Sequence, residues 1–138
     1  MGRASIVAAL LVAQLCAVGV SADEDRRFPN EKITKEQWQT YRQELLARPG
    51  ATTSVIADQL IIAFPEEANT YYIFTEPKHP AYPAIVIRKL VEANGAISVR
   101  RTGYYAGIES AFANWWKQFD EVDAEFRRDV ESAKDQSN

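Results

Sequence analysis

Residues 84–104, AIVIRKLVEANGAISVRRTGY, decide the fold because two runs of β-branched and apolar residues flank the pair Asn94-Gly95. Asparagine and glycine both tolerate positive φ, so this pair predicts the two-residue type I′ turn of a β-hairpin. The two runs are therefore expected to be antiparallel strands over 84–92 and 97–104. In that register Leu90 lies opposite Val99, and the basic residues of the two strands face one another.

Two further strands are expected upstream of this hairpin. Residues 56–64 and 70–75 are rich in β-branched and aromatic residues, and the segments 65–69 and 76–83 between them carry turn-forming residues. The connections between consecutive strands are short. The sequence therefore predicts a four-stranded antiparallel meander.

A helix is predicted before the sheet and a longer one after it. Thr34 and Gln37 have the spacing of a capping box, and Pro49-Gly50 ends the first helix. After Gly107 apolar residues recur with helical spacing. This stripe consists of Ile108, Phe112, Trp115, Trp116, Phe119, Val122, Phe126 and Val130.

The fold class that follows is α+β, with an N-terminal helix, a four-stranded meander and a long C-terminal amphipathic helix packed on the sheet. Both helices are expected to cover the one apolar face of the sheet. A ligand-stacking or membrane-surface role of the aromatic stripe is the alternative to core packing. We expect one domain over residues 34–133 and a frayed tail over 134–138.

The first 22 residues have the order of a cleavable export signal. Arg3 precedes an uncharged, mostly apolar run over 6–20, and the small pair Ser21-Ala22 follows it. The run is shorter than the roughly 20 apolar residues that span a bilayer. We expect cleavage after Ala22, a flexible leader over 23–33, and a periplasmic or secreted protein without a transmembrane segment.

Composition excludes several functional classes for the mature chain. Removal of the signal leaves 15 basic and 19 acidic residues, a balance that argues against a dedicated nucleic-acid binder. Cys16 lies in the signal, so disulfides, thiolate metal ligands and a cysteine nucleophile are excluded from the mature chain. The sequence also lacks phosphate-binding, dinucleotide-binding and hydrolase motifs. No cofactor, metal site or catalytic residue is predicted.

The loop 76–83 contains the only histidine, His79. Three prolines restrict its backbone, so it should be stiff and extended. A stiff loop loses little entropy on binding, which makes Lys78, His79 and Tyr82 candidates for recognition of a partner. The alternatives are that His79 shapes the turn or, least favoured, that it acts as a catalytic base.

The hairpin register brings like charges together. Arg88 is expected opposite Arg101 on one face, and Lys89 opposite Arg100 on the other. Each such pair is unfavourable by about 0.2–1 kcal/mol unless it is compensated. Acidic residues of the last helix or of the Glu66-Glu67 turn, simple solvation, or an acidic ligand could compensate it. Arg88, Arg100, Arg101 and the neighbouring Tyr104 are accordingly candidate binding residues.

Residues 71–83, YYIFTEPKHPAYP, and 103–107, GYYAG, resemble small exported bacterial proteins of unassigned activity. The resemblance covers roughly residues 55–120. It implies a bacterial source and an exported α+β domain, and it provides no catalytic residue. In size and layout the chain is also similar to periplasmic lysozyme inhibitors, although none of their motifs matches residue by residue.

The function expected from the sequence is that of an exported, non-enzymatic binding module, an inhibitor of or accessory to another exported protein. Its partner would be that protein or an acidic ligand. The alternative is a small enzyme or ligand carrier with a pocket between the sheet and the C-terminal helix. The sequence leaves the oligomeric state open.

Overall fold

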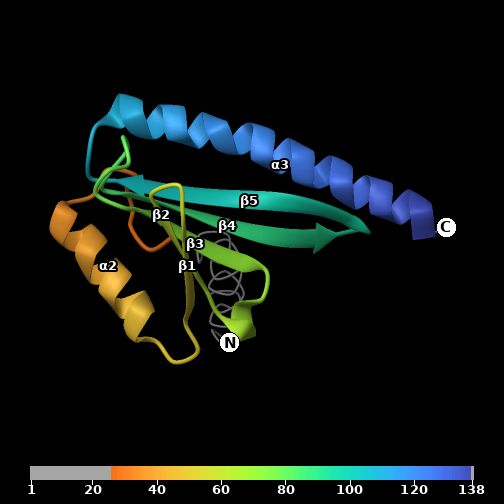
Figure 1. Cartoon of the computed structure of the whole chain (residues 1–138), viewed down its shortest axis with the longest axis horizontal. Coiled ribbons are helices and arrows are strands. Elements are labelled where there is room, and N and C mark those ends of the chain that lie inside the picture. The colour runs from red at the N-terminus through yellow and green to blue at the C-terminus, as the bar shows by residue number, and fades with distance from the viewer. Residues whose placement is uncertain (1–25, 138) are drawn as a thin grey trace, which may run out of the picture.

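The computed structural model of the chain describes residues 26–137, and the predicted export signal lies outside them (Figure 1). The fold is α+β, with an antiparallel sheet of five strands in sequential order and a long C-terminal helix. The elements are α2 (Lys35–Ala47), β1 (Thr52–Ile56), β2 (Gln59–Ala63), the 3-10 turn η2 (Pro65–Glu67), β3 (Thr70–Thr75), β4 (Ala84–Ala93), β5 (Ala96–Tyr105) and α3 (Glu109–Ser137).

The prediction of four strands is wrong, because the stretch expected as one strand over 56–64 belongs to a hairpin of two. β1 and β2 pair antiparallel, with Ile56 opposite Gln59. The two residues between them, Ala57 and Asp58, have φ of 51° and 60°. Positive φ at both central positions is the geometry of a tight hairpin turn. Alanine rarely adopts it, so the sequence carries no glycine or asparagine to mark the turn.

The register of the central hairpin is confirmed. In the β4–β5 pair, Arg88 lies opposite Arg101 and Lys89 lies opposite Arg100. Asn94 and Gly95 form the turn, with φ of 53° and 79°. The side chains of the two basic pairs therefore leave the sheet on opposite faces.

The two helices cover opposite faces of the sheet (Figure 1), whereas the sequence led us to expect both on one face. The reason is that the central strands are apolar on both faces. In β4, Ile85 belongs to the cluster with α2, and its neighbour Val86 belongs to the cluster with α3. A sheet that is apolar on both sides requires two covers.

α2 is held to the sheet by aromatic residues and by its start. Thr34 and Gln37 form both halves of the predicted capping box. The indole of Trp38 donates a hydrogen bond of 2.9 Å to the carbonyl oxygen of Ala84. Tyr41 packs edge-to-face against Phe74, with 5.9 Å between the ring centres.

α3 buries only part of the predicted stripe. Phe112, Trp115 and Phe119 are buried against the sheet, whereas Ile108 is 67% exposed and Val122 is 46% exposed. The helix continues to Ser137 through the residues expected to fray. Near its end, Lys134 donates a hydrogen bond to the carbonyl oxygen of Gly95 at the hairpin tip.

Residues 26–33, the described part of the expected flexible leader, pack against the sheet. The amide of Ile33 donates to the carbonyl oxygen of Tyr105, and the amide of Tyr105 donates to Glu31, both at 2.9 Å. Ile33 is buried, and Phe28 packs against the α2-side core. The apolar side chains of this charged segment provide the contacts that hold it in place.

Gly103 allows α3 to lie directly on β5. A Cβ atom at this position would come within 2.7 Å of the Phe112 ring and 2.8 Å of the Trp116 ring. The rings belong to a packed core and have little room to move. We expect Gly103→Ala to lower the free energy of unfolding by about 1–3 kcal/mol, as overpacking does. Urea unfolding measures this, and Gly95→Ala is a poor control because its φ is positive, so Ser98→Ala on the same strand is preferable.

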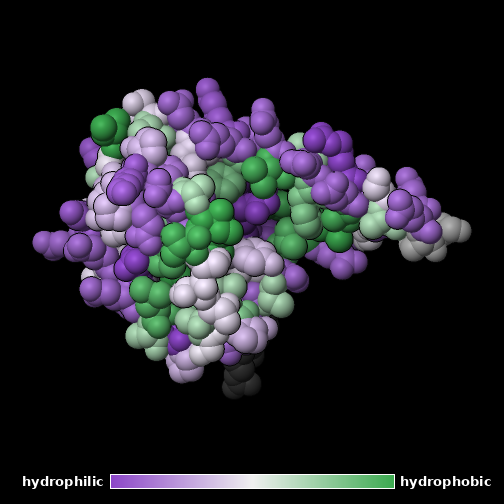
Figure 2. Space-filling view, in the orientation of Figure 1, coloured by the Kyte–Doolittle hydropathy of each residue, from purple (hydrophilic) through white to green (hydrophobic). Residues whose placement is uncertain are grey.

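None of the helices formed by residues 26–137 is both long enough and apolar enough to cross a bilayer. Hydrophilic side chains dominate along the outer side of α3, and hydrophobic ones gather below it over the sheet (Figure 2).

Candidate functional site

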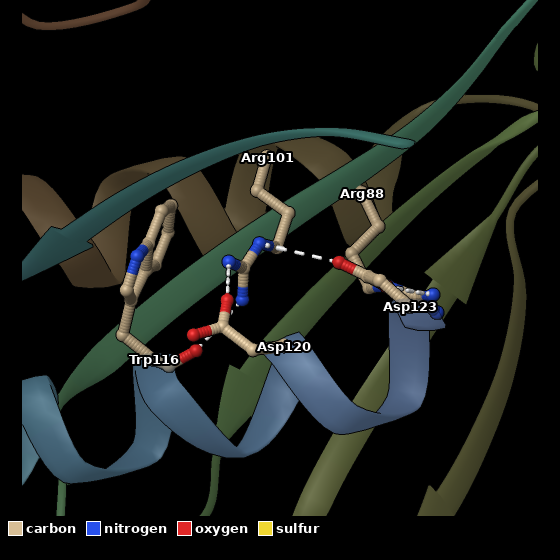
Figure 3. A network of polar contacts seen from close by, with 5 residues as sticks. All are labelled: Arg88, Arg101, Trp116, Asp120 and Asp123. Carbon is tan, nitrogen blue, oxygen red and sulfur yellow. Dashed lines mark hydrogen bonds and ion pairs between the residues drawn. The ribbon is translucent and has the colours of Figure 1, made fainter. Parts of the chain in front are cut away.

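On the α3 face the predicted like-charge pair is neutralised by the helix (Figure 3). Arg88 donates to Asp123 through Nε, at 2.9 Å, and through Nη2. Arg101 lies 3.3 Å from the other oxygen of Asp123 and also pairs with Asp120. It donates a third hydrogen bond, of 2.7 Å, to the carbonyl oxygen of Trp116.

Arg88 and Arg101 therefore act as structural residues of the α3 interface. Their side chains are 17% and 14% exposed, and that of Asp123 is 10% exposed. The guanidinium of Arg101 also lies 4.4 Å from the centre of the Trp116 ring. Of the three compensators considered for this pair, the acidic residues of the last helix are the ones present.

Tyr104 is also part of the core. Its side chain is fully buried. Its hydroxyl oxygen accepts a 2.8 Å hydrogen bond from the amide of Arg27, and its ring packs edge-to-face on Phe28 at 5.1 Å. Tyr104 thus anchors the leader to the sheet and presents no surface to a partner.

The loop 76–83 is held to the body by two of its three candidate residues. His79 Nδ1 accepts a 3.0 Å hydrogen bond from the amide of Ala81, and its ring packs against Trp115 at 5.0 Å. Burial lowers the pKa of His79, although the charge of Asp58 acts in the opposite direction. The imidazole is therefore neutral at pH 7 and shapes the turn. Tyr82 packs against Trp38 at 5.2 Å, and Lys78 is exposed.

The loop and the remaining basic pair are not brought together. The loop follows Thr75 at the end of β3, whereas Lys89 pairs with Thr70 at the start of that strand. The length of β3, about 17 Å at 3.3 Å per residue, separates them. Sequence reasoning grouped them into one surface, and the structure places them at opposite ends of the sheet.

Lys89 and Arg100 line an open groove of about 720 Å³ on the α2 face. The groove lies where α2 ends and the β4–β5 hairpin continues beyond it. Its walls come from the leader, α2, the η2 turn and the three last strands. The lining residues are Arg27, Tyr41, Leu45, Arg48, Glu66, Glu67, Ala68, Asn69, Thr70, Tyr72, Ile87, Lys89, Leu90, Arg100 and Thr102.

A polar network forms one wall of the groove. Arg48 donates to Glu67 at 2.6 Å and to Glu66 at 3.2 Å. Tyr72 donates a 2.7 Å hydrogen bond to the other oxygen of Glu67. Burial, together with this bond, raises the pKa of Tyr72 to about 12.

The carboxyl of Glu67 is ionised at neutral pH. Burial acts to raise its pKa, but hydrogen bonds from Tyr72 and Arg48 and the nearby charge of Lys89 outweigh it and lower the pKa. Burial also raises the pKa of Tyr41. Neither tyrosine of the groove is therefore a base near pH 7.

The lining carries a net positive charge. Four cationic side chains face two carboxylates, and the pairing of Arg27 with Glu44 at the rim leaves an excess of positive charge. Within residues 26–137, no group of three or more histidine, aspartate or glutamate side chains could hold a metal ion. The groove can hold an anion through charge and hydrogen bonds, and it offers no nucleophile with an adjacent base.

Sequence reasoning identified Arg100 in this groove and missed Arg27, Arg48 and Tyr72. No spacing along the chain connects these residues, because each comes from a different element. No family model, curated protein or solved structure matches the chain.

Proposed function

We propose that the protein is an exported, non-enzymatic binding module that holds an acidic ligand, or an acidic part of another exported protein, in the α2-side groove. The net positive lining of the groove is the observation that carries this proposal. Export is proposed from the first 22 residues, and the resemblance to small exported bacterial proteins agrees with it.

The groove suits recognition better than catalysis. It is open and shallow enough for a side chain or a peptide, and its charged groups come from four separate elements, which fixes their positions. The segment between the sheet and α3, where the alternative pocket was expected, is filled by the aromatic cluster of Phe112, Trp115 and Phe119. A role as an inhibitor of or accessory to another exported protein follows from binding without chemistry.

The proposal predicts that charge reversal in the groove weakens binding of an acidic probe. Titration of the purified protein with hexaglutamate, followed by calorimetry, should show binding that Lys89→Glu and Arg100→Glu each weaken by about tenfold, or about 1.4 kcal/mol. Raising the salt concentration should reduce the affinity further, because the partly exposed charges are screened.

The matched control is Arg128→Glu, the same charge change at an exposed position of α3. It should leave the affinity within twofold of the unmodified protein. Equal weakening by all three variants would mean that only net charge matters, and the groove would lose its role. Circular dichroism verifies that each variant is folded.

A further inference from the structure

β5 lies at one edge of the sheet, and its outer side is open over most of its length. Among the described residues, only the leader pairs with this edge, through the parallel bridge between Lys32 and Tyr105. The amide and the carbonyl oxygen of Tyr105 are both used in that bridge. The edge thus already accepts one extended segment at its C-terminal end.

The backbone groups beyond this bridge face the same way. Along an antiparallel pair, residues alternate between bonding to the partner strand and pointing away from it. Since Tyr105 points away from β4, Gly103 and Arg101 do so too. A cleft of about 260 Å³ lies beside them, lined by Arg26, Glu31, Arg100, Arg101, Thr102, Gly103 and Trp116.

The cleft and the α2-side groove share part of their lining. Arg100 and Thr102 belong to both, so the edge of β5 connects the two hollows. A strand added at this edge would direct its side chains alternately to the two faces. On the α2 face they would meet the cationic groove, and on the α3 face they would lie near the Trp116 ring.

We propose that an extended segment of a partner protein, with acidic and apolar side chains in alternation, adds to the sheet at β5. Main-chain hydrogen bonds to Arg101 and Gly103 would provide affinity, and the alternate side chains would provide specificity, as in other cases of strand addition. The charge of Arg100 and of the groove selects the acidic face. This inference rests on the proposed function and states how the acidic partner binds.

The test uses the purified exported protein and a synthetic octapeptide of alternating glutamate and valine. Amide hydrogen exchange by NMR should show Arg101 and Gly103 slowed by about tenfold or more when the peptide is bound, because their amides gain partners. Amides on the α3 helix remain unchanged and serve as internal controls.

Two N-methylated forms of the peptide provide matched controls. Each carries methyl groups on one alternate set of amides, so only one form loses the bonds to β5. Affinity should fall by about tenfold for one form and stay within twofold for the other. A peptide of the same composition with its glutamates in one block should bind more weakly than the alternating peptide.

Several outcomes would overturn the inference. Equal binding by both methylated forms, with shift changes confined to the groove around Lys89, would leave the proposed function standing and remove strand addition. Protection of Gly103 before any peptide is added, with a dimer by sedimentation, would show a second copy at the edge. No shift change anywhere in the protein would reject both the inference and the proposed function.

Discussion

Replacing Asp123 with alanine is expected to lower the free energy of unfolding by about 3–5 kcal/mol, the usual cost of removing one partner from a buried ion pair. Its carboxylate bridges Arg88 and Arg101, which lie opposite one another across β4 and β5. Without it, two nearly buried guanidinium groups face each other, and Arg88 loses the carboxylate it donates to (Figure 3). Urea unfolding followed by tryptophan fluorescence measures the loss.

Asp120→Ala is the matched control for that change. Asp120 also pairs with Arg101, but its side chain is 64% exposed, and exposed ion pairs contribute about 0–1 kcal/mol. A triple variant with Arg88→Met, Arg101→Met and Asp123→Leu should recover most of the stability, since apolar residues of similar volume often replace a buried ionic cluster at little cost. Similar losses for Asp120→Ala and Asp123→Ala would contradict the bridging role.

The parts of the fold that could be predicted from the sequence have local signals. Asn94-Gly95 fixed a register that alternation then extended along both strands, and Thr34 with Gln37 marked the start of α2. The turn at Ala57-Asp58 has no such signal. Its positive φ values are imposed by the pairing of β1 with β2, which is a tertiary effect.

The arrangement of the helices could not be read from periodicity alone. A helical stripe shows that one side of a helix is buried, but not which face of the sheet buries it. The continuous apolar run 84–87 in β4 was the available clue, because a strand that is buried on both sides needs a cover on each.

The candidate site could be predicted only in part, for a similar reason. The hairpin register identified both like-charge pairs, yet it could not show that Asp123 lies over one of them and an open groove over the other. That distinction depends on where α2 and α3 end on the sheet. It separates Arg88 and Arg101, which stabilise the fold, from Arg100, which remains available to a ligand groove.

Phe119→Ala should also be strongly destabilising, by about 3–5 kcal/mol, because a large buried side chain is removed and a cavity remains. Phe119 packs edge-to-face on Trp115, with 5.3 Å between ring centres, and lies within 6.0 Å of the Arg88 and Arg101 guanidinium groups. The cavity would therefore open beside two charges as well as beside the apolar cluster. Thermal and urea unfolding should both detect the change.

Val122→Ala on the same helix is the control that separates the structure from the sequence pattern. Val122 belongs to the same apolar stripe as Phe119, but it is 46% exposed. Helical periodicity alone would give both positions a buried role, whereas the packing of α3 gives it only to Phe119. We expect Val122→Ala to change stability by less than about 0.5 kcal/mol, as surface substitutions do. Comparable losses at both positions would mean that α3 buries its whole stripe and lies on the sheet in a different orientation.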